Sequence, residues 1–205
     1  MITIIDYNAG NLTSVKRALD HLDIKSKITG DYKEIECAEK IIFPGVGNAL
    51  TAMKTLIDRN IDKALLTAFN KGIPIMGICI GAQIILSFSE EENTKCLGLI
   101  EGNAVKFNLS NPSLKIPHMG WNDITIKKKH PVLKDIITGS EFYFVHSYYP
   151  MPDKSEMIYA TCEYEIEFPA IIGTKNLIAS QFHAEKSGKI GLNILKNFSQ
   201  WDGLI

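Results

Sequence analysis

The chain has 205 residues, of which 45% are hydrophobic and 22% charged, a composition typical of a globular domain. We therefore expect one domain over residues 1–205. Its 22 basic and 23 acidic residues leave a formal net charge of −1, too little to attract nucleic acid or an anionic membrane. The most basic run, IKKKH at residues 126–130, is better explained as a solvated turn than as a nucleic-acid site.

The cysteines and the start of the chain indicate a reducing compartment. Cys37, Cys79, Cys96 and Cys162 form no CxxC pair, so we expect no zinc site and no disulfide framework. We also expect no cofactor. The first residues, MITIIDYNAG, lack the charged segment of a signal peptide. The longest mostly apolar stretch, residues 73–86, is too short and interrupted to cross a bilayer. The sequence thus predicts a soluble cytoplasmic protein.

The first half of the chain alternates short apolar runs with amphipathic segments. Strands are predicted at residues 1–6, 39–45 and 73–78. Helices are predicted at residues 11–22, 48–60, 61–72 and 81–91. This alternation is typical of a parallel sheet that helices cover on both faces.

The second half is richer in β-branched and aromatic residues. Its predicted strands are residues 102–108, 121–127, 141–149, 156–164, 169–175 and 176–183. A helix at residues 188–201 closes the chain. The whole sequence therefore predicts an α/β fold with a mixed sheet.

Cys79 lies between Gly77 and Gly81, at the end of the third predicted strand. Glycines on both sides leave room for a sharp turn that strains the central residue and exposes its side chain. The start of the following helix would favour a thiolate and a developing oxyanion above it. This pattern predicts a nucleophile, and its alternative is a buried structural cysteine in a glycine-rich turn.

His183 is the candidate base that such a nucleophile needs. It follows an apolar run and would lie at the carboxyl end of a strand, where α/β sheets place their sites. Glu185 comes two residues later, so in an extended chain its side chain points the same way and could orient the imidazole. The alternative is a strand-end histidine beside a glutamate that faces solvent.

A third motif, FPGVG at residues 43–47, ends another predicted strand with two glycines. Its flexible backbone could turn an N–H group towards a substrate carbonyl, although a plain loop would have the same sequence. The three motifs occur together at the ends of apolar strands, and this joint occurrence favours a catalytic site.

These motifs resemble the class I (triad) glutamine amidotransferases. The segments that carry the resemblance are IDYNAGNLTSVKRAL, FPGVG, GICIGAQ, PHMGWN, FYFVHSYY and QFHAEKS, and it extends over about residues 2–198. More narrowly, PHMGWN and FVHSY resemble the glutaminase subunits of imidazole glycerol phosphate synthase, from histidine biosynthesis. The resemblance implies a flavodoxin-like fold, with a mostly parallel central sheet, helices on both faces and additional antiparallel strands.

The resemblance also implies an activity, the hydrolysis of L-glutamine to glutamate and ammonia. Cys79 would attack the amide carbon to give a thioester, His183 would move the protons, and Glu185 would orient His183. The ammonia would pass to a cyclase subunit, bound as a heterodimer partner, that makes imidazole glycerol phosphate and AICAR. The partner would also activate the glutaminase.

Further residues match family positions. The oxyanion would be held by the N–H of Ile80 and by backbone at Val46 or Gly47. The positions that contact glutamine correspond to Gln83, Glu91, His146, Ser147 and Tyr148. The positions near the partner interface and the ammonia exit correspond to Asn11, His118, Trp121, Tyr143 and Lys186.

The sequence departs from the family pattern without losing a catalytic atom. Ala184 replaces the proline of FHPEKS, and Ile80 and Ala82 replace two residues of GICLGMQ. Three alternatives therefore stay open. The first is a paralogous subunit that feeds ammonia to a sugar amidotransferase in surface-polysaccharide biosynthesis, the second a self-contained cysteine hydrolase, and the third a non-catalytic binding module.

Overall fold

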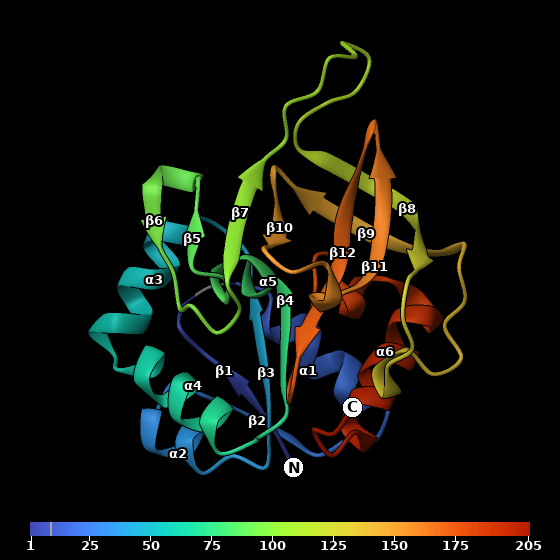
Figure 1. Ribbon diagram of the computed structural model, residues 1–205. Coiled ribbons are helices and arrows are strands. Elements are labelled where there is room, and N and C mark those ends of the chain that lie inside the picture. The colour runs from blue at the N-terminus through green and yellow to red at the C-terminus, as the bar shows by residue number, and fades with distance from the viewer. Residues whose placement is uncertain (9) are drawn as a thin grey trace.

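A nine-stranded mixed sheet runs through the computed structural model, which describes residues 1–8 and 10–205 (Figure 1). Its strand order is β2-β1-β3-β4-β13-β12-β11-β8-β9. The first five strands pair in parallel, in the 2-1-3-4-5 order of flavodoxin-like folds. They are β2 (Ser26–Thr29), β1 (Ile2–Ile5), β3 (Lys40–Gly45), β4 (Ile75–Cys79) and β13 (Leu177–Ser180).

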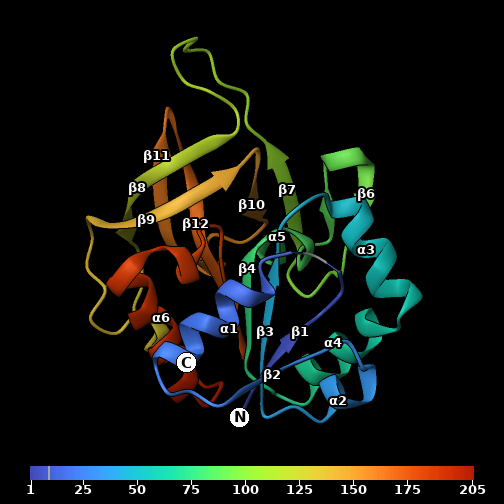
Figure 2. The same cartoon turned by 180° about the vertical axis from the view of Figure 1, so that it is seen from behind.

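Helices cover both faces of this parallel half, as the sequence predicted. Helices α1 (Leu12–His21) and α6 (Gly188–Gln200) pack their apolar sides into one core cluster, and they lie side by side in Figure 2. The short α2 (Tyr32–Glu36), with α3 (Ala49–Asp58) and α4 (Ile61–Asn70), packs into a second cluster on the other face. Because β1, β3, β4 and β13 each supply side chains to both clusters, these four parallel strands are buried on both sides, whereas the edge strand β2 is half-buried.

The antiparallel half extends the same sheet. It contains β12 (Ile166–Thr174), β11 (Ile158–Tyr164), β8 (His118–Ile126) and β9 (Ser140–His146). A second, four-stranded sheet consists of β10 (Tyr148–Pro152), β7 (Gly102–Lys106), β5 (Phe88–Ser89) and β6 (Thr94–Lys95). Single 3-10 turns are η1 (Glu91–Asn93), η2 (Pro131–Leu133), η3 (Ser155–Met157) and η4 (Ala184–Lys186).

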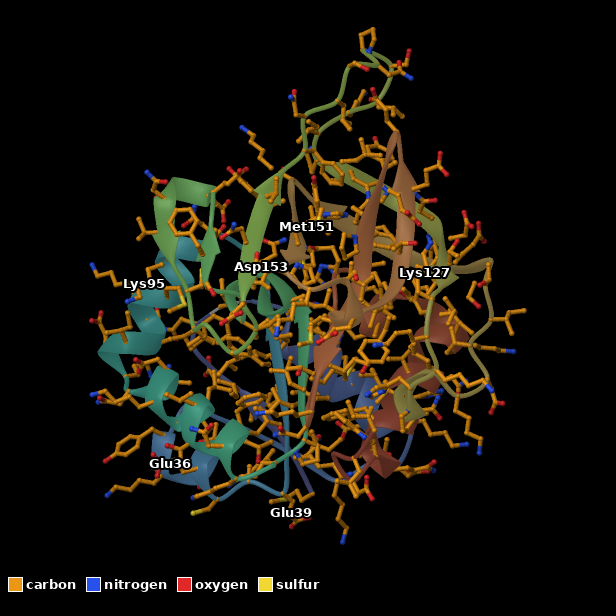
Figure 3. All side chains as sticks on the ribbon, in the orientation of Figure 1. Glu36, Glu39, Lys95, Lys127, Met151 and Asp153 are labelled. Atoms are coloured by element: carbon orange, nitrogen blue, oxygen red, sulfur yellow. The ribbon has the colours of Figure 1, made fainter. Side chains whose placement is uncertain are left out.

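Charged side chains lie at the periphery, and apolar ones fill the space between the layers. Figure 3 labels Glu36, Glu39 and Lys95 at the outer edges of the molecule. Lys127 forms an ion pair with Glu167 at 2.5 Å. Among the described residues, no helix has the length and apolar character needed to span a membrane.

Two sequence predictions were wrong in detail. The helix predicted at residues 81–91 is only α5 (Ile80–Ile84), because the chain then turns to place β5 in the second sheet. The single strand predicted at residues 141–149 is divided at Ser147 into β9 and β10, which belong to different sheets. Short apolar runs do not reveal such divisions, since buried helix and buried strand have the same hydrophobic pattern.

Candidate active site

A cavity of about 250 Å³ lies at the carboxyl ends of three neighbouring parallel strands, β3, β4 and β13. This is the edge where open α/β sheets bind ligands. Its lining comprises Val46, Gly47, Cys79, Ile80, Gln83, Glu91, Pro117, Val145, His146, Ser147, Tyr148 and His183. All the residues predicted for the nucleophile, base, oxyanion hole and glutamine contacts therefore meet here, together with Pro117 and Val145, which the sequence analysis did not select.

A larger cavity, of about 590 Å³, lies elsewhere, beside β8 and η2. Lys128, Lys134, Tyr159 and Ile205 are among the residues that line it, and it contains none of the predicted site residues. We therefore place the candidate active site in the smaller cavity, whose size suits a ligand smaller than the drug-sized molecules that occupy pockets of about 300–1,000 Å³.

Cys79 carries the backbone strain of the turn between β4 and α5. Its φ of 56° and ψ of −107° are rare for a residue with a side chain. Gly77 and Gly81 serve close packing instead, because an added Cβ would lie 2.9 Å from the Gly81 oxygen at the first position and 2.2 Å from the Phe43 oxygen at the second. Cys79 is 6% exposed, so the predicted exposed side chain is instead enclosed by the cavity walls.

The Cys79 sulfur has two polar neighbours. It lies 3.9 Å from the carbonyl oxygen of Val145 and 3.8 Å from Nε2 of Gln181. Gln181 is fully buried and follows β13, inside the same QFHAEKS motif that contains His183. Gln181 was not among the predicted site residues, although a glutamine at the end of an otherwise apolar strand indicates a buried amide that needs hydrogen-bond partners.

The backbone of His183 is held by two neighbours, β9 and Ser187. Its N–H donates to the Tyr143 oxygen at 2.9 Å, and its own carbonyl accepts from the Ser187 hydroxyl at 2.6 Å. Its Nδ1 lies 2.7 Å from Oε1 of Glu185, and both side chains are almost completely buried. The extended chain predicted between the two residues is wrong, since the 3-10 turn η4 brings the carboxylate to the imidazole.

The imidazole of His183 is more basic than usual. Burial alone would lower its pKa, but the interaction with Cys79 and the hydrogen bond to Glu185 raise the pKa above its ordinary value of 6.5. Within the described part of the chain, Nε2 of His183 is buried and has no hydrogen bond of ordinary geometry. Asn11 also donates to Glu185, which places it behind the imidazole.

The loop after β3 and the start of α5 form the opposite wall. Gly47 has a φ of 113°, in the region that favours glycine, and an added Cβ there would meet nothing within 4 Å. The preceding Val46 is 37% exposed, whereas Ile80 is buried at the first residue of α5. Val46 and Gly47 thus line the same cavity as the strained cysteine.

Among the predicted glutamine contacts, Gln83 and Glu91 are already hydrogen-bonded within the protein. Gln83 Nε2 donates to the Tyr148 oxygen at 2.8 Å and to Oε1 of Gln181 at 3.0 Å. Glu91 Oε2 accepts from the Ala49 N–H at 2.6 Å. Both side chains nevertheless reach the cavity, where Gln83 forms part of the wall and Glu91 supplies its negative charge.

A chain of hydrogen bonds supports the segment between β9 and β10. Asn122 Nδ2 lies 3.3 Å from Nε2 of His118, whose Nδ1 lies 3.0 Å from Nε2 of His146. His146 Nδ1 in turn lies 2.9 Å from the Tyr148 oxygen. That carbonyl can only accept, so each histidine carries its proton on Nδ1. Burial lowers the pKa of His118 to about 4 and that of His146 to about 3, which keeps both neutral.

The residues predicted near the partner interface occupy different places. Trp121 is 55% exposed and its ring meets that of Tyr143 edge to face, 6.2 Å between centroids. Lys186 is also exposed. Asn11 contacts Glu185 instead, and His118 is buried within the hydrogen-bond chain, so neither presents a free side chain at the surface.

Comparison with known proteins identifies the family of the chain. The family model "Glutamine amidotransferase class-I" matches residues 3–200. A crystal structure titled "glutamine amidotransferase" superposes with a TM-score of 0.74 over 100% of both chains, at 18% identity, which supports the fold. The chain therefore belongs to the class I glutamine amidotransferases, and the predicted fold class is confirmed.

Within this class, the curated relatives named "Imidazole glycerol phosphate synthase subunit HisH" match nearly the whole chain. The protein of that name from Nitratidesulfovibrio vulgaris (strain Miyazaki F) is 49% identical over 97% of this chain and 95% of its own length. The one from Caldanaerobacter subterraneus subsp. tengcongensis is 46% identical over 98% of both. The narrower resemblance seen in the sequence is therefore confirmed.

Proposed function

We propose that the chain, as a single domain over residues 1–205, is the glutaminase subunit of an imidazole glycerol phosphate synthase in histidine biosynthesis. Its likeness to the HisH subunits supports the assignment. The structural observation that carries the chemistry is the strained Cys79, which shares one cavity with a His183 that is hydrogen-bonded to Glu185.

The reaction begins with a proton transfer and an attack by sulfur. The Cys79 thiol gives its proton to Nε2 of His183, and the thiolate attacks the side-chain amide carbon of glutamine. Glu185 and Asn11 hold the imidazole from behind, so the buried imidazolium is stabilised. The raised pKa of His183 favours this transfer.

The tetrahedral intermediate places a negative charge on the former amide oxygen. The N–H of Ile80, at the start of α5, and a backbone N–H at Val46 or Gly47 are the donors that we assign to it. When the intermediate collapses, the C–N bond breaks and ammonia leaves with the proton from His183. His183 then removes a proton from water, which hydrolyses the thioester to glutamate and restores the thiol.

The ammonia goes to a cyclase partner. Outside a dry passage it would be protonated at neutral pH, and ammonium is not a nucleophile. We assign the partner face to the side that carries Trp121, Tyr143 and Lys186. Trp121 is an exposed aromatic residue that packs against Tyr143, and aromatic residues are enriched at protein interfaces. We also propose the cytoplasm, where thiols stay reduced, as the compartment.

Glutamate release by the purified chain, alone and with its cyclase, tests this function. We expect weak hydrolysis by the isolated chain, strong activation by the cyclase and no activity in Cys79→Ala. We expect the cyclase to activate the glutaminase by rotating the peptide at Gly47, since this rotation would complete the oxyanion hole. Full turnover without a partner would support a self-contained hydrolase, and activation only by a sugar amidotransferase would support the paralogous role.

A further inference from the structure

Two buried glutamine side chains connect the wall of the cavity to the nucleophile. Gln83, in α5, donates to Oε1 of Gln181 at 3.0 Å, and Gln181 Nε2 lies 3.8 Å from the Cys79 sulfur. Gln83 is 4% exposed and Gln181 is fully buried. The backbone of Gln181 is fixed as well, because its N–H donates to the Ala170 oxygen of β12 at 2.8 Å.

The hydrogen-bond pattern determines which way both amides face. The Tyr148 carbonyl can only accept, so the nitrogen of Gln83 must point towards it, at 2.8 Å. The second hydrogen of that nitrogen goes to Oε1 of Gln181. The atom of Gln181 that faces sulfur is therefore its nitrogen, and an N–H group points at the nucleophile.

The two neighbours of the sulfur suit different protonation states. The Val145 oxygen, at 3.9 Å, can accept a hydrogen bond from the neutral thiol but repels a thiolate. The Gln181 nitrogen is a donor, and a donor binds an anionic sulfur more strongly than a neutral one. Gln181 therefore supplies a side-chain N–H donor to this sulfur, in addition to the nearby imidazole of His183.

We propose that Gln181 donates a hydrogen bond to the Cys79 thiolate during catalysis, and that Gln83 positions Gln181 for this task. The proposal rests on the function assigned above. When the thiol proton passes to Nε2 of His183, the new negative charge on sulfur is held by the Gln181 amide. Gln83 acts through Gln181, since its own nitrogen is fully used by the Tyr148 and Gln181 oxygens.

Alkylation of Cys79 by iodoacetamide as a function of pH tests the proposal without glutamine. The modified peptide is followed by mass spectrometry, because Cys37 is exposed and also reacts. In Gln181→Glu, one oxygen still accepts from Gln83 while the other faces the sulfur, so the donor becomes an anion. In Gln181→Met, the donor is removed and no charge is added.

Both variants should move the midpoint of alkylation to higher pH by about one unit, with Gln181→Glu moving it further, because a hydrogen bond to a charged group is lost. At pH 7 the alkylation rate should fall by up to about tenfold. The other titratable groups that face the sulfur or line its cavity are Tyr7, Glu91, His146, Tyr148 and His183. All of them remain in both variants, so a shift in the alkylation midpoint is caused by the change at Gln181.

Asn176→Leu is the matched control. Asn176 directly precedes β13, and Gln181 directly follows it. Asn176 is 4% exposed, and its side-chain nitrogen donates to the Phe69 oxygen at 3.1 Å and to the Ile73 oxygen at 2.6 Å. Its loss should lower the thermal unfolding midpoint and leave the alkylation midpoint unchanged. If the Gln181 variants behave in the same way, Gln181 is only structural and the proposal is overturned.

The proposal and the proposed function can fail separately. An unchanged alkylation midpoint in a chain whose glutaminase activity depends on Cys79 would overturn only the role of Gln181. A shifted midpoint in a chain that never hydrolyses glutamine would support the stabilised thiolate and contradict the glutaminase assignment. Gln181→Glu preserves the shape and the contact with Gln83, so it decides the question even if Gln181→Met does not fold.

Discussion

At the scale of the residue, Cys79 and its flanking glycines have different roles in the turn between β4 and α5. Cys79 adopts the rare backbone angles, with a φ of 56°, while the glycines at 77 and 81 let α5 approach β3 and β4 closely. The sequence pattern predicted the turn correctly, because glycines around a cysteine are unusual in an apolar run. The strain on the central cysteine was also predicted correctly, but the close packing of the glycines was not, since it depends on contacts with Phe43, which lies 38 residues before Gly81.

A comparison of two glycine substitutions tests this close packing. In Gly81→Ala the new Cβ would lie 2.2 Å from a backbone oxygen, whereas in Gly77→Ala the shortest contact is 2.9 Å. We therefore expect Gly81→Ala to lower the free energy of unfolding by about 2–3 kcal/mol and Gly77→Ala by about 1 kcal/mol or less. Urea denaturation measures both, and a larger effect for Gly77→Ala would contradict the packing account.

At the scale of the element, three loops after β3, β4 and β13 assemble the site. The sequence placed each motif at a strand end, and parallel strands bring such ends together, so most of the site could be predicted. The features of the fold and the site that were not predicted depend on tertiary contacts, which the hydrophobic pattern of the sequence does not show. The edge strand β2, half-buried with the sequence SKIT, has too weak an apolar signal to be recognised. The burial of His118 depends likewise on aromatic neighbours from distant strands.

The turn η4 provides a test at this scale. Ala184 is its first residue, where a proline fits the 3-10 geometry, and the preceding His183, with φ −87° and ψ 95°, is extended and so outside the α region that a following proline disfavours. None of the described hydrogen bonds uses the Ala184 N–H. We expect Ala184→Pro to raise the free energy of unfolding by about 0.4–1 kcal/mol and to keep glutaminase activity. A loss of stability in denaturant titration would show that the turn needs a different φ.

At the scale of the whole molecule, buried neutral histidines make stability depend on pH. Burial lowers the pKa of His118, His130 and His146 to between about 3 and about 4, below the ordinary value of 6.5. Between these values the unfolded chain binds more protons than the folded one, so stability falls as the pH drops below 6.5.

The free energy of unfolding should therefore fall between pH 7 and pH 5, by at most about 2 kcal/mol for each of the three histidines. Urea denaturation at several pH values measures it. His21 is exposed, so His21→Gln serves as a control that should not alter the trend. In His130→Phe, the trend should weaken because one buried group no longer titrates. Stability that rises as the pH falls from 7 to 5 would contradict the neutral, buried state.

The central claim is that Cys79 is the nucleophile of a glutaminase site, and covalent labelling tests it most directly. A glutamine analogue with a reactive chloroketone group is added to the chain with its cyclase, and the labelled peptide is identified by mass spectrometry. We predict that the label appears on Cys79, that L-glutamine protects against it, and that His183→Ala slows it strongly. Label on another cysteine, with glutaminase activity retained in Cys79→Ala, would contradict the account.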